Sequence, residues 1–454
     1  MEFTHIKRTG YVLGALLVTS MMAGCGAAST NAAPQHSDTT NLSMSIDYTY
    51  QPSVAPIQAL IRAYEQAHPH VHITLELGVD KEKTASQLAA GDAPDIVILG
   101  TARDLGSFAY DHGVIPLNTL IHQSHFPLNE LVPATVKQGE SPYNGKIYGL
   151  TFLEDTYEVY YNPALFKAAG ITALPKNLTQ MVADARLLTK TNSAGQITQL
   201  GWDPSIWDED KPNLSAIFGG TVANPQGTQS TIDNPAFVRG LAWNQSAYQA
   251  QGGYQAVSRF VDSFAEGGTN AGQNGSVGPF ASGREGMIVR GDYYTNKLQL
   301  LVPHLHYGTF LLPAPASGPN IVGGTPLGGN PVCITADDKD PGPAWQFMSW
   351  MLTDGQVYLA KHQLLTGNWS ATPNYIPLLR QPDLEPNPHF RWFWHVMLTD
   401  PNKFTLPMMA NIAQYTALID QYSQEAMQGS ISASAAAHDI QVQENRDLSG
   451  LGVQ

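Results

Sequence analysis

A repeated alternation of strand and helix patterns constrains the fold more than any other feature. Residues 42–48 alternate apolar and polar side chains, which is typical of a strand, and residues 54–68 space apolar side chains as a helix does. Residues 71–75 predict a second strand, and residues 94–100 predict a third that is continuously apolar. A strand of that kind is buried on both faces, as in a parallel sheet covered by helices. The order predicts an α/β fold with ligand contacts near the carboxyl ends of its strands.

The next part of the chain, residues 156–298, is predicted to be mostly helical. Its helices are expected over residues 163–169, 178–189, 235–249 and 258–265, with an irregular stretch over residues 203–231. Strand patterns return at residues 286–289, 307–312 and 331–335, and a further helix is predicted over residues 343–351. The pattern therefore predicts a second α/β unit after the first.

Composition and charge narrow the classes of partner. The 454 residues are 43% apolar and 14% charged, which suits two or three domains with large cores rather than a disordered chain. The net charge of −14 repels nucleic acid and anionic membrane surfaces, so neither is an expected partner. Two cysteines in different contexts argue against a disulfide framework. Cys333, in an apolar run, is interpreted as a small buried hydrophobe.

The N-terminus carries an export pattern. Lys7 and Arg8 precede an apolar run over residues 11–22, which is shorter than the ~20 residues that span a bilayer. The run ends in Met22-Ala23-Gly24-Cys25, which resembles the lipobox of bacterial lipoproteins and implies lipidation of Cys25. We predict a signal peptide over residues 1–24; an ordinary signal peptide with an incidental cysteine is the alternative. Residues 25–41 have no large apolar side chain after the cysteine and predict a flexible, lipid-anchored tether.

Four sequence blocks resemble those of one known family. They are Gly-Asp-Ala-Pro-Asp-Ile-Val at residues 91–97, Tyr-Asn-Gly-Lys-Ile-Tyr-Gly-Leu at residues 143–150, the Tyr-Tyr-Asn block at residues 160–170, and residues 283–293. Their order is similar to that in bacterial extracellular solute-binding proteins of the maltose-binding type, the receptors of ABC importers. The resemblance runs from about residue 42 to about residue 445. One departure is Thr151, which stands where the family usually has proline.

The resemblance implies a two-lobed, periplasmic-binding-protein-like fold of type II. Each lobe would be a mostly parallel sheet flanked by helices, and several crossing strands would form a hinge. Lobe I would comprise residues 42–155 and about 330–370, and lobe II would comprise about 156–329 and 371–454. The ligand would lie in the cleft between the lobes, and closure would be a hinge motion.

The resemblance also implies a function. We expect a monomeric lipoprotein outside the cytoplasmic membrane that binds a small polar solute, a mono- or oligosaccharide, and delivers it to an ABC transporter permease. The membrane would be contacted only through the lipid, and no cofactor is expected. Two alternatives stay open: a non-sugar solute (a polyamine, a phosphodiester or a peptide), and a secreted carbohydrate-acting enzyme. The sequence has no G-x-S-x-G elbow, Walker loop or H-E-x-x-H motif, so we expect neither catalytic residues nor a metal.

A sugar site needs aromatic rings for the flat faces of the sugar, and charged or amide groups for its hydroxyls. Residues of these types stand at strand ends, at the expected lobe crossings and in glycine-rich turns. The candidate ligand-binding residues are Tyr50, Gln51, Thr101, Arg103, Glu154, Asp155, Trp202, Trp207, Asp292, Tyr293, Gly329, Asn330, Trp369 and Tyr415.

Structural roles compete at several of these positions. Arg103 could form a surface ion pair, and Glu154 and Asp155 could be paired with a nearby base. Of Trp202 and Trp207, at least one should face the cleft or the core, because an exposed indole is costly. Glu154 and Asp155 are a poor glycosidase pair, since neighbouring residues on an extended chain point to opposite sides.

Overall fold

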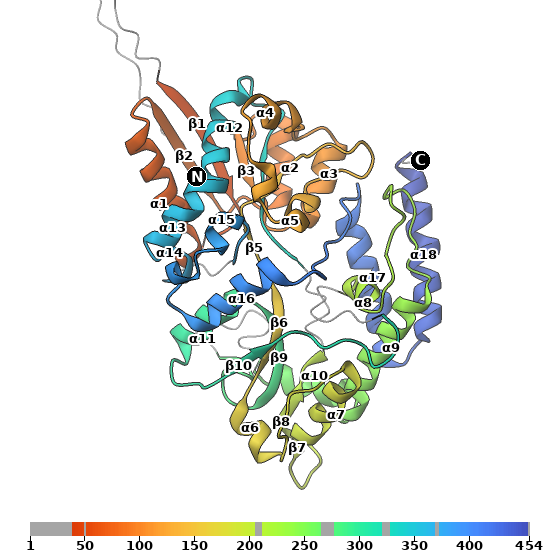
Figure 1. Ribbon diagram of the computed structural model, residues 1–454. Helices are drawn as coiled ribbons and strands as arrows, with labels where there is room; N and C mark the ends of the chain where they lie inside the picture. The colour runs from red at the N-terminus through yellow and green to blue at the C-terminus, as the bar shows by residue number, and fades with distance from the viewer. Residues whose placement is uncertain are drawn as a thin grey trace, which may run out of the picture. The chain divides into compact units, whose positions relative to one another are not determined.

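The N-terminal strands form a sheet that a late strand completes (Figure 1). Its order is β2-β1-β3-β11-β4. The strands are β1 (Thr40–Ile46), β2 (Val71–Leu77), β3 (Ile96–Ile98), β4 (Leu150–Thr151) and β11 (Pro331–Ile334). β1 pairs in parallel with β2 and β3, whereas β11 pairs antiparallel with β3 and β4. The computed structural model describes residues 39–49, 51–204, 211–264, 277–319, 327–367 and 372–452.

A second sheet follows in the order β10-β6-β9-β8-β7. Its strands are β6 (Tyr157–Tyr161), β7 (Lys190–Thr191), β8 (Ile197–Trp202), β9 (Glu285–Gly291) and β10 (Gly308–Phe310). β8 and β9 pair in parallel, and the other pairings of this sheet are antiparallel. Both sheets are therefore mixed.

Helices flank the two sheets. The first sheet is accompanied by α1 (Gln51–Ala67), α2 (Lys81–Ala90), the 3₁₀ turn η1 (Ala102–Asp104), α3 (Leu105–Tyr110), α4 (Asn118–Gln123) and α5 (Pro133–Gln138). The middle of the chain adds α6 (Pro163–Ala168), α7 (Leu178–Leu188), α8 (Asn213–Ile217), α9 (Pro235–Ala250), α10 (Tyr254–Asp262) and α11 (Tyr293–Leu301). The last part contains α12 (Pro341–Trp350), α13 (Gln356–Lys361), α14 (Leu364–Gly367), α15 (Ile376–Leu379), α16 (Pro388–Thr399), α17 (Ile412–Gln428) and α18 (Ala433–Gly450).

Local capping chemistry fixes where several helices begin. The Asn162 side chain accepts hydrogen bonds from the backbone N–H groups of Ala164 and Leu165, and proline occupies the first turn of α6. Asn234 caps α9 in the same way. An asparagine cap followed by proline satisfies free N–H groups and presets the helical φ angle. These short signals explain why α6 and α9 begin at their predicted residues, whereas α10 begins four residues before its predicted start.

The chain crosses between the sheets along more than one path. Residues 152–156 connect β4 of the first sheet with β6 of the second, and β5 (Leu153–Glu154) lies on this path. β5 pairs antiparallel with β12 (Thr372–Pro373), and Thr156 forms an isolated bridge with Leu327. In Figure 1, β5 lies between the two sheets, and the chain then continues into β6 of the second sheet. This pairing of crossing segments is the multi-strand connection that the family resemblance implies.

Each sheet has its own core of apolar side chains. One cluster contains Ile46, Ile98 and Val332 of the first sheet, and the other contains Val159, Leu200 and Val289 of the second. Helix α16 contributes to both clusters, with Phe390 and Trp394 in the first and Phe393 in the second. The exact lobe boundaries therefore stay a prediction. Cys333 is fully buried, and burial raises the pKa of its thiol, as expected for a small hydrophobe.

Two details differ from the sequence predictions. The stretch over residues 156–298 is not mostly helical, because β6, β7 and β8 lie in it, with β6 and β8 on either side of the central strand β9. The sheets are also less parallel than expected, because β11 and β6, which adjoin the crossing segments, run antiparallel to β3 and β9 respectively. Residues 1–38, which carry the predicted signal peptide, Cys25 and most of the tether, lie outside the described residues. None of the described helices is both long and apolar enough to span a membrane.

Candidate functional site

A cavity of about 180 Å³, here called the cleft cavity, lies where segments of both sheets meet. Residues 100–103, directly after β3, form one wall, and Asp155, Tyr157, Leu327 and Gly328 of the crossing segments form another. Asn213, at the start of α8, and residues 405–407, before α17, complete the lining together with Ile412. The cavity thus sits at the carboxyl end of β3, where α/β sheets commonly bind ligands.

The turn after β3 is held in place by one buried amide. The Asn330 side chain donates hydrogen bonds to the carbonyl oxygens of Gly100 at 2.7 Å and Leu99 at 3.2 Å, and to the Tyr48 hydroxyl at 2.9 Å. A Cβ atom on Gly100 would lie 2.6 Å from a carboxylate oxygen of Asp47, so a side chain there would displace the Asp47 carboxylate. Asn330 therefore ties a late crossing segment to the ends of two N-terminal strands.

Polar groups follow at the N-terminus of η1. The Thr101 hydroxyl accepts from the backbone N–H of Arg103 at 3.4 Å, and both side chains line the cavity. A hydroxyl and a guanidinium at one wall offer both donors and acceptors to a bound solute. The position of this pair, just after a buried strand, is what the sequence prediction relied on.

Asp155 and Tyr157 project from the crossing segment toward the same cavity. Residues two apart on an extended chain share a side, so their joint placement follows from the backbone. The Tyr157 ring meets the Tyr293 ring edge-on at a centroid distance of 6.3 Å, and the Lys297 ammonium lies 5.4 Å from the centre of the Tyr293 ring. The segment is bridged to its neighbour, since the Gly328 N–H donates to the Asp155 carbonyl at 3.4 Å. The cavity therefore has a carboxylate and an aromatic ring side by side.

Two fully buried acids lie close to Asp155. Burial, and secondarily the charge of Asp155, raise the pKa of Glu154 well above its usual value, and the same two causes raise the pKa of Asp292. Glu154 accepts from the Gln138 amide at 3.3 Å, and Asp292 accepts from the Thr372 hydroxyl. Both acids therefore favour the protonated form, which reduces charge repulsion around Asp155.

Of the predicted contacts, Thr101, Arg103 and Asp155 line the cleft cavity. Glu154, Asp292 and Asn330 are buried beside it, and Tyr293, which is not part of the lining, contacts Tyr157. Gly329 lies against the hinge, since a Cβ atom there would meet the Thr151 side chain at 2.3 Å. Gln51 begins α1 with an exposed side chain that does not line the cavity.

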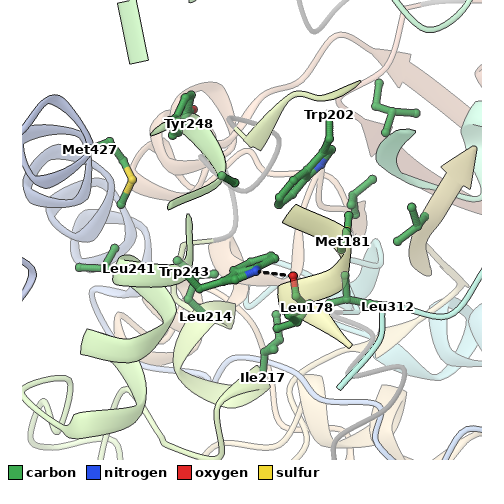
Figure 2. Close-up of a cluster of buried hydrophobic side chains, with 14 of the residues drawn as sticks. Leu178, Met181, Trp202, Leu214, Ile217, Leu241, Trp243, Tyr248, Leu312 and Met427 are labelled. Carbon is green, nitrogen blue, oxygen red and sulfur yellow. Dashed lines mark hydrogen bonds between the residues drawn. The ribbon is translucent and has the colours of Figure 1, made fainter. Parts of the chain in front are cut away.

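Trp202 and Tyr415 have a different place. Both are fully buried in the core of the second sheet. Figure 2 shows Trp202 near Trp243, whose indole N–H donates to the Leu178 carbonyl at 3.1 Å, and the Tyr415 hydroxyl contacts Ser230 at 2.6 Å. We therefore omit these two residues from the proposed contacts. Tyr50, Trp207 and Trp369 lie outside the described residues.

The sequence interpretation missed several residues of the lining. Tyr157 carried a usable signal, because it stands two residues after Asp155 on an extended segment. Asn213 and residues 405–407 carried none, since only the fold brings these loops to the end of β3. Among the described residues, no group of three or more His, Cys, Asp or Glu side chains is arranged to hold a metal ion.

The chain belongs to the family of bacterial extracellular solute-binding proteins, whose sequence model matches residues 49–358. This family comprises binding proteins, not enzymes. Binding proteins of Brucella abortus (strain 2308) and Brucella suis biovar 1 are 23% identical to it over 303 residues. The match covers 64% of this chain and spans 66% of the length of these relatives.

Solved structures share the fold. CpMnBP1 with mannotriose bound has a TM-score of 0.74 and 22% identity, and the match covers 89% of this chain and 99% of that one. The sugar-binding protein MalE of Xanthomonas citri has a TM-score of 0.73 and 16% identity, with 90% and 98% covered. The GacH receptor of Streptomyces glaucescens has a TM-score of 0.69 and 20% identity, with 90% and 99% covered. These likenesses confirm the two-lobed α/β fold and the predicted resemblance to the maltose-binding type.

Proposed function

We propose that the protein binds a mono- or oligosaccharide in the cleft cavity and delivers it to an ABC importer. The observation that carries the proposal is the convergence of Thr101 and Arg103, after β3, with Asp155 and Tyr157, on the crossing segment. Hydroxyl, guanidinium and carboxylate groups match the donors and acceptors of sugar hydroxyls, and a tyrosine ring matches the flat face of a sugar. Structures with the same fold that hold mannotriose or acarbose support the choice of ligand class.

Binding would be coupled to closure of the two lobes. The lining comes from the end of the first sheet, from the crossing segments, from the start of α8 and from the segment that leads into α17. A ligand that contacts all of them only in the closed form shifts the population toward that form. The importer permease would then recognise the closed receptor, which acts as a monomer.

We also propose that the protein works outside the cytoplasmic membrane on a lipid anchor. Support comes from the basic and apolar pattern of residues 1–24, which ends at Cys25, and from the extracellular character of the family. A tether over residues 25–41 would keep the receptor at high effective concentration near its permease. Metabolic labelling with a radioactive fatty acid tests this, and a Cys25→Ser variant should lose the label.

Calorimetric titration against a panel of neutral oligosaccharides tests the ligand class. We expect saturable binding by at least one saccharide, lowered about 10- to 100-fold by Asp155→Ala, because each hydrogen bond to a charged group contributes ~1.5–3 kcal/mol. Tyr157→Ala should weaken binding as well. Asp262→Ala, an exposed acid at the end of α10, is the matched control and should bind as the wild type does.

Three results would contradict the proposal. Binding confined to polyamines, phosphodiesters or peptides would agree with a receptor role but would show that the ligand is not a sugar. Steady release of new products from an oligosaccharide would indicate an enzyme. Equal affinity in the Asp155→Ala variant and the wild type would place the ligand elsewhere. Mass spectrometry of ligand retained by the purified protein would identify the natural solute directly.

A further inference from the structure

A second cavity, here called the tyrosine cavity, lies at the far end of α3. Its volume is about 470 Å³. Tyr110, Tyr143 and Tyr148 line it from the N-terminal part of the chain, and Met408 and Gly452 line it from the C-terminal part. Nothing in the proposed transport function uses it.

The tyrosine cavity is separate from the cleft cavity. Among the described residues, the two linings have no member in common. They are divided where Gly106 of α3 meets the main chain of Met409, since a Cβ atom on Gly106 would lie only 2.0 Å from the Met409 carbonyl oxygen. Residues 405–407 therefore face the cleft cavity, whereas Met408 faces the tyrosine cavity. An occupant of one cavity does not need to touch an occupant of the other.

The hydroxyl groups of the three tyrosines are already engaged. Tyr110 donates to the Leu451 carbonyl at 2.6 Å, and Tyr148 accepts from the Asn144 amide at 3.1 Å. Tyr143 donates to the Gly227 carbonyl at 3.2 Å and accepts from the Ala410 N–H at 3.0 Å. The rings are thus fixed at their far ends. A ligand that meets rings held in this way avoids most of the entropy cost of ordering them.

The aromatic surface of the tyrosine cavity comes mainly from Tyr110 and Tyr143, because Tyr148 is buried in an apolar cluster. The Tyr110 and Tyr143 centroids are 6.3 Å apart with 57° between the ring planes, so neither ring covers the face of the other. Ring faces attract the apolar C–H surface of a ligand, whereas hydroxyl-rich edges need hydrogen-bonding groups. Ser141, Asn144 and His112 supply such groups within the same lining.

The charge of the lining narrows the ligand class. None of the described residues that line the tyrosine cavity is Asp, Glu, Lys or Arg. An ionised ligand would therefore lose hydration there without gaining a charged partner. Rigid aromatic faces, neutral hydrogen-bonding groups and a volume within the usual range for small-molecule pockets together favour a neutral, ring-shaped, hydroxyl-rich molecule.

We propose that the tyrosine cavity is a second binding site, for a neutral saccharide of one or two rings. Because its walls come from the N-terminal and the C-terminal parts of the chain, an occupant stabilises the contact between them. The site does not depend on ligand in the cleft cavity.

Hydrogen–deuterium exchange with maltose and with mannobiose, each at about 50 mM to detect millimolar affinity, tests the proposal. Saccharide binding in the cleft cavity is first removed by the double substitution Asp155→Ala and Tyr157→Ala. We expect exchange to slow about threefold or more in peptides covering residues 105–112 and 139–149. In the same background, Asn144→Trp should block the cavity and Tyr110→Ala should remove a ring, and each should abolish the protection. Lys146→Trp, in the same turn but not in the lining, should retain it.

Two outcomes overturn the proposal. The first is unchanged exchange in both peptides with either sugar. The second is protection that disappears in the cleft double variant, because it would then report closure around a cleft ligand only. Failure of saccharide binding in the cleft is a separate result, since protection at residues 105–112 and 139–149 is measured with the cleft already disabled.

Discussion

Replacing Asn330 by alanine should loosen the turn that forms one wall of the cleft cavity. Asn330 is 3% exposed, and its amide faces three oxygens, those of Tyr48, Leu99 and Gly100, at 2.9, 3.2 and 2.7 Å. Two N–H groups give two strong bonds, each with a net contribution of ~1 kcal/mol, and their removal leaves buried acceptors without a donor. The free energy of unfolding should therefore fall by ~2–4 kcal/mol.

Urea unfolding measures this loss of stability, and calorimetric titration with a saccharide that the wild type binds measures the loss of affinity. The saccharide affinity should fall about tenfold, because Gly100 and Thr101 lose their anchor; this corresponds to ~1.4 kcal/mol. Asn192→Ala is the control: Asn192 accepts two backbone bonds of 3.0 Å but is exposed, so its loss should cost less than ~1 kcal/mol. The reasoning is refuted if Asn330→Ala unfolds within ~0.5 kcal/mol of the wild type, which is the range of ordinary surface changes.

Two further changes test other features. Gly106→Ala would place a Cβ atom 2.0 Å from the Met409 oxygen, so α3 and the segment before α17 must move apart at a cost of ~1–3 kcal/mol. Melting temperature and saccharide affinity should both fall in Gly106→Ala. The control Gly450→Ala, at a position where no described neighbour lies within 4 Å, should change neither. A Gly106→Ala protein with unchanged melting temperature and affinity would contradict the close contact. For Glu444, which is 1% exposed, burial raises the pKa to about 7, above its ordinary 4.5. As pH rises, Glu444 loses its proton at a lower pH in the unfolded chain than in the folded protein. Between pH 4.5 and 7 the free energy of unfolding of the wild type should therefore fall as pH rises, and Glu444→Gln should lack this contribution to the fall. Urea unfolding at pH 5 and pH 8 measures this change in the free energy of unfolding. An equal change in the wild type and in Glu444→Gln would contradict the prediction.

The first sheet was predictable because its strands obey simple patterns. Residues 96–99 are apolar throughout, and Ile96, Val97 and Ile98 are indeed buried. β6 is buried just as deeply but includes Glu158, a buried acid that accepts the Leu312 N–H at 3.1 Å. An acid in a central strand breaks both the alternating and the continuous apolar pattern. Hydropathy therefore gives no strand signal there, although the family block does cover part of it.

The candidate site was partly predictable for a related reason. Thr101 and Arg103 follow a buried strand, and Asp155 lies on the expected crossing, so position in the chain indicates position in the fold. Trp202 shows the limit of that reasoning. Its polar neighbours suggested a cleft, but β8 carries it into the core beside Trp243, at a ring distance of 5.3 Å. Residues 405–407 reach the cavity only through tertiary packing, which no local pattern encodes.

The position of β11 also constrains how this chain can be made. Residue 332 pairs with residues 98 and 150, so a strand synthesised late must enter between two that emerge early. Until it arrives, β3 exposes an unpaired edge, which invites pairing with other chains. Contacts this distant in sequence also slow folding. A fragment that ends before residue 331 should therefore aggregate rather than fold, and the nascent chain must extend past residue 334 before its first sheet can close.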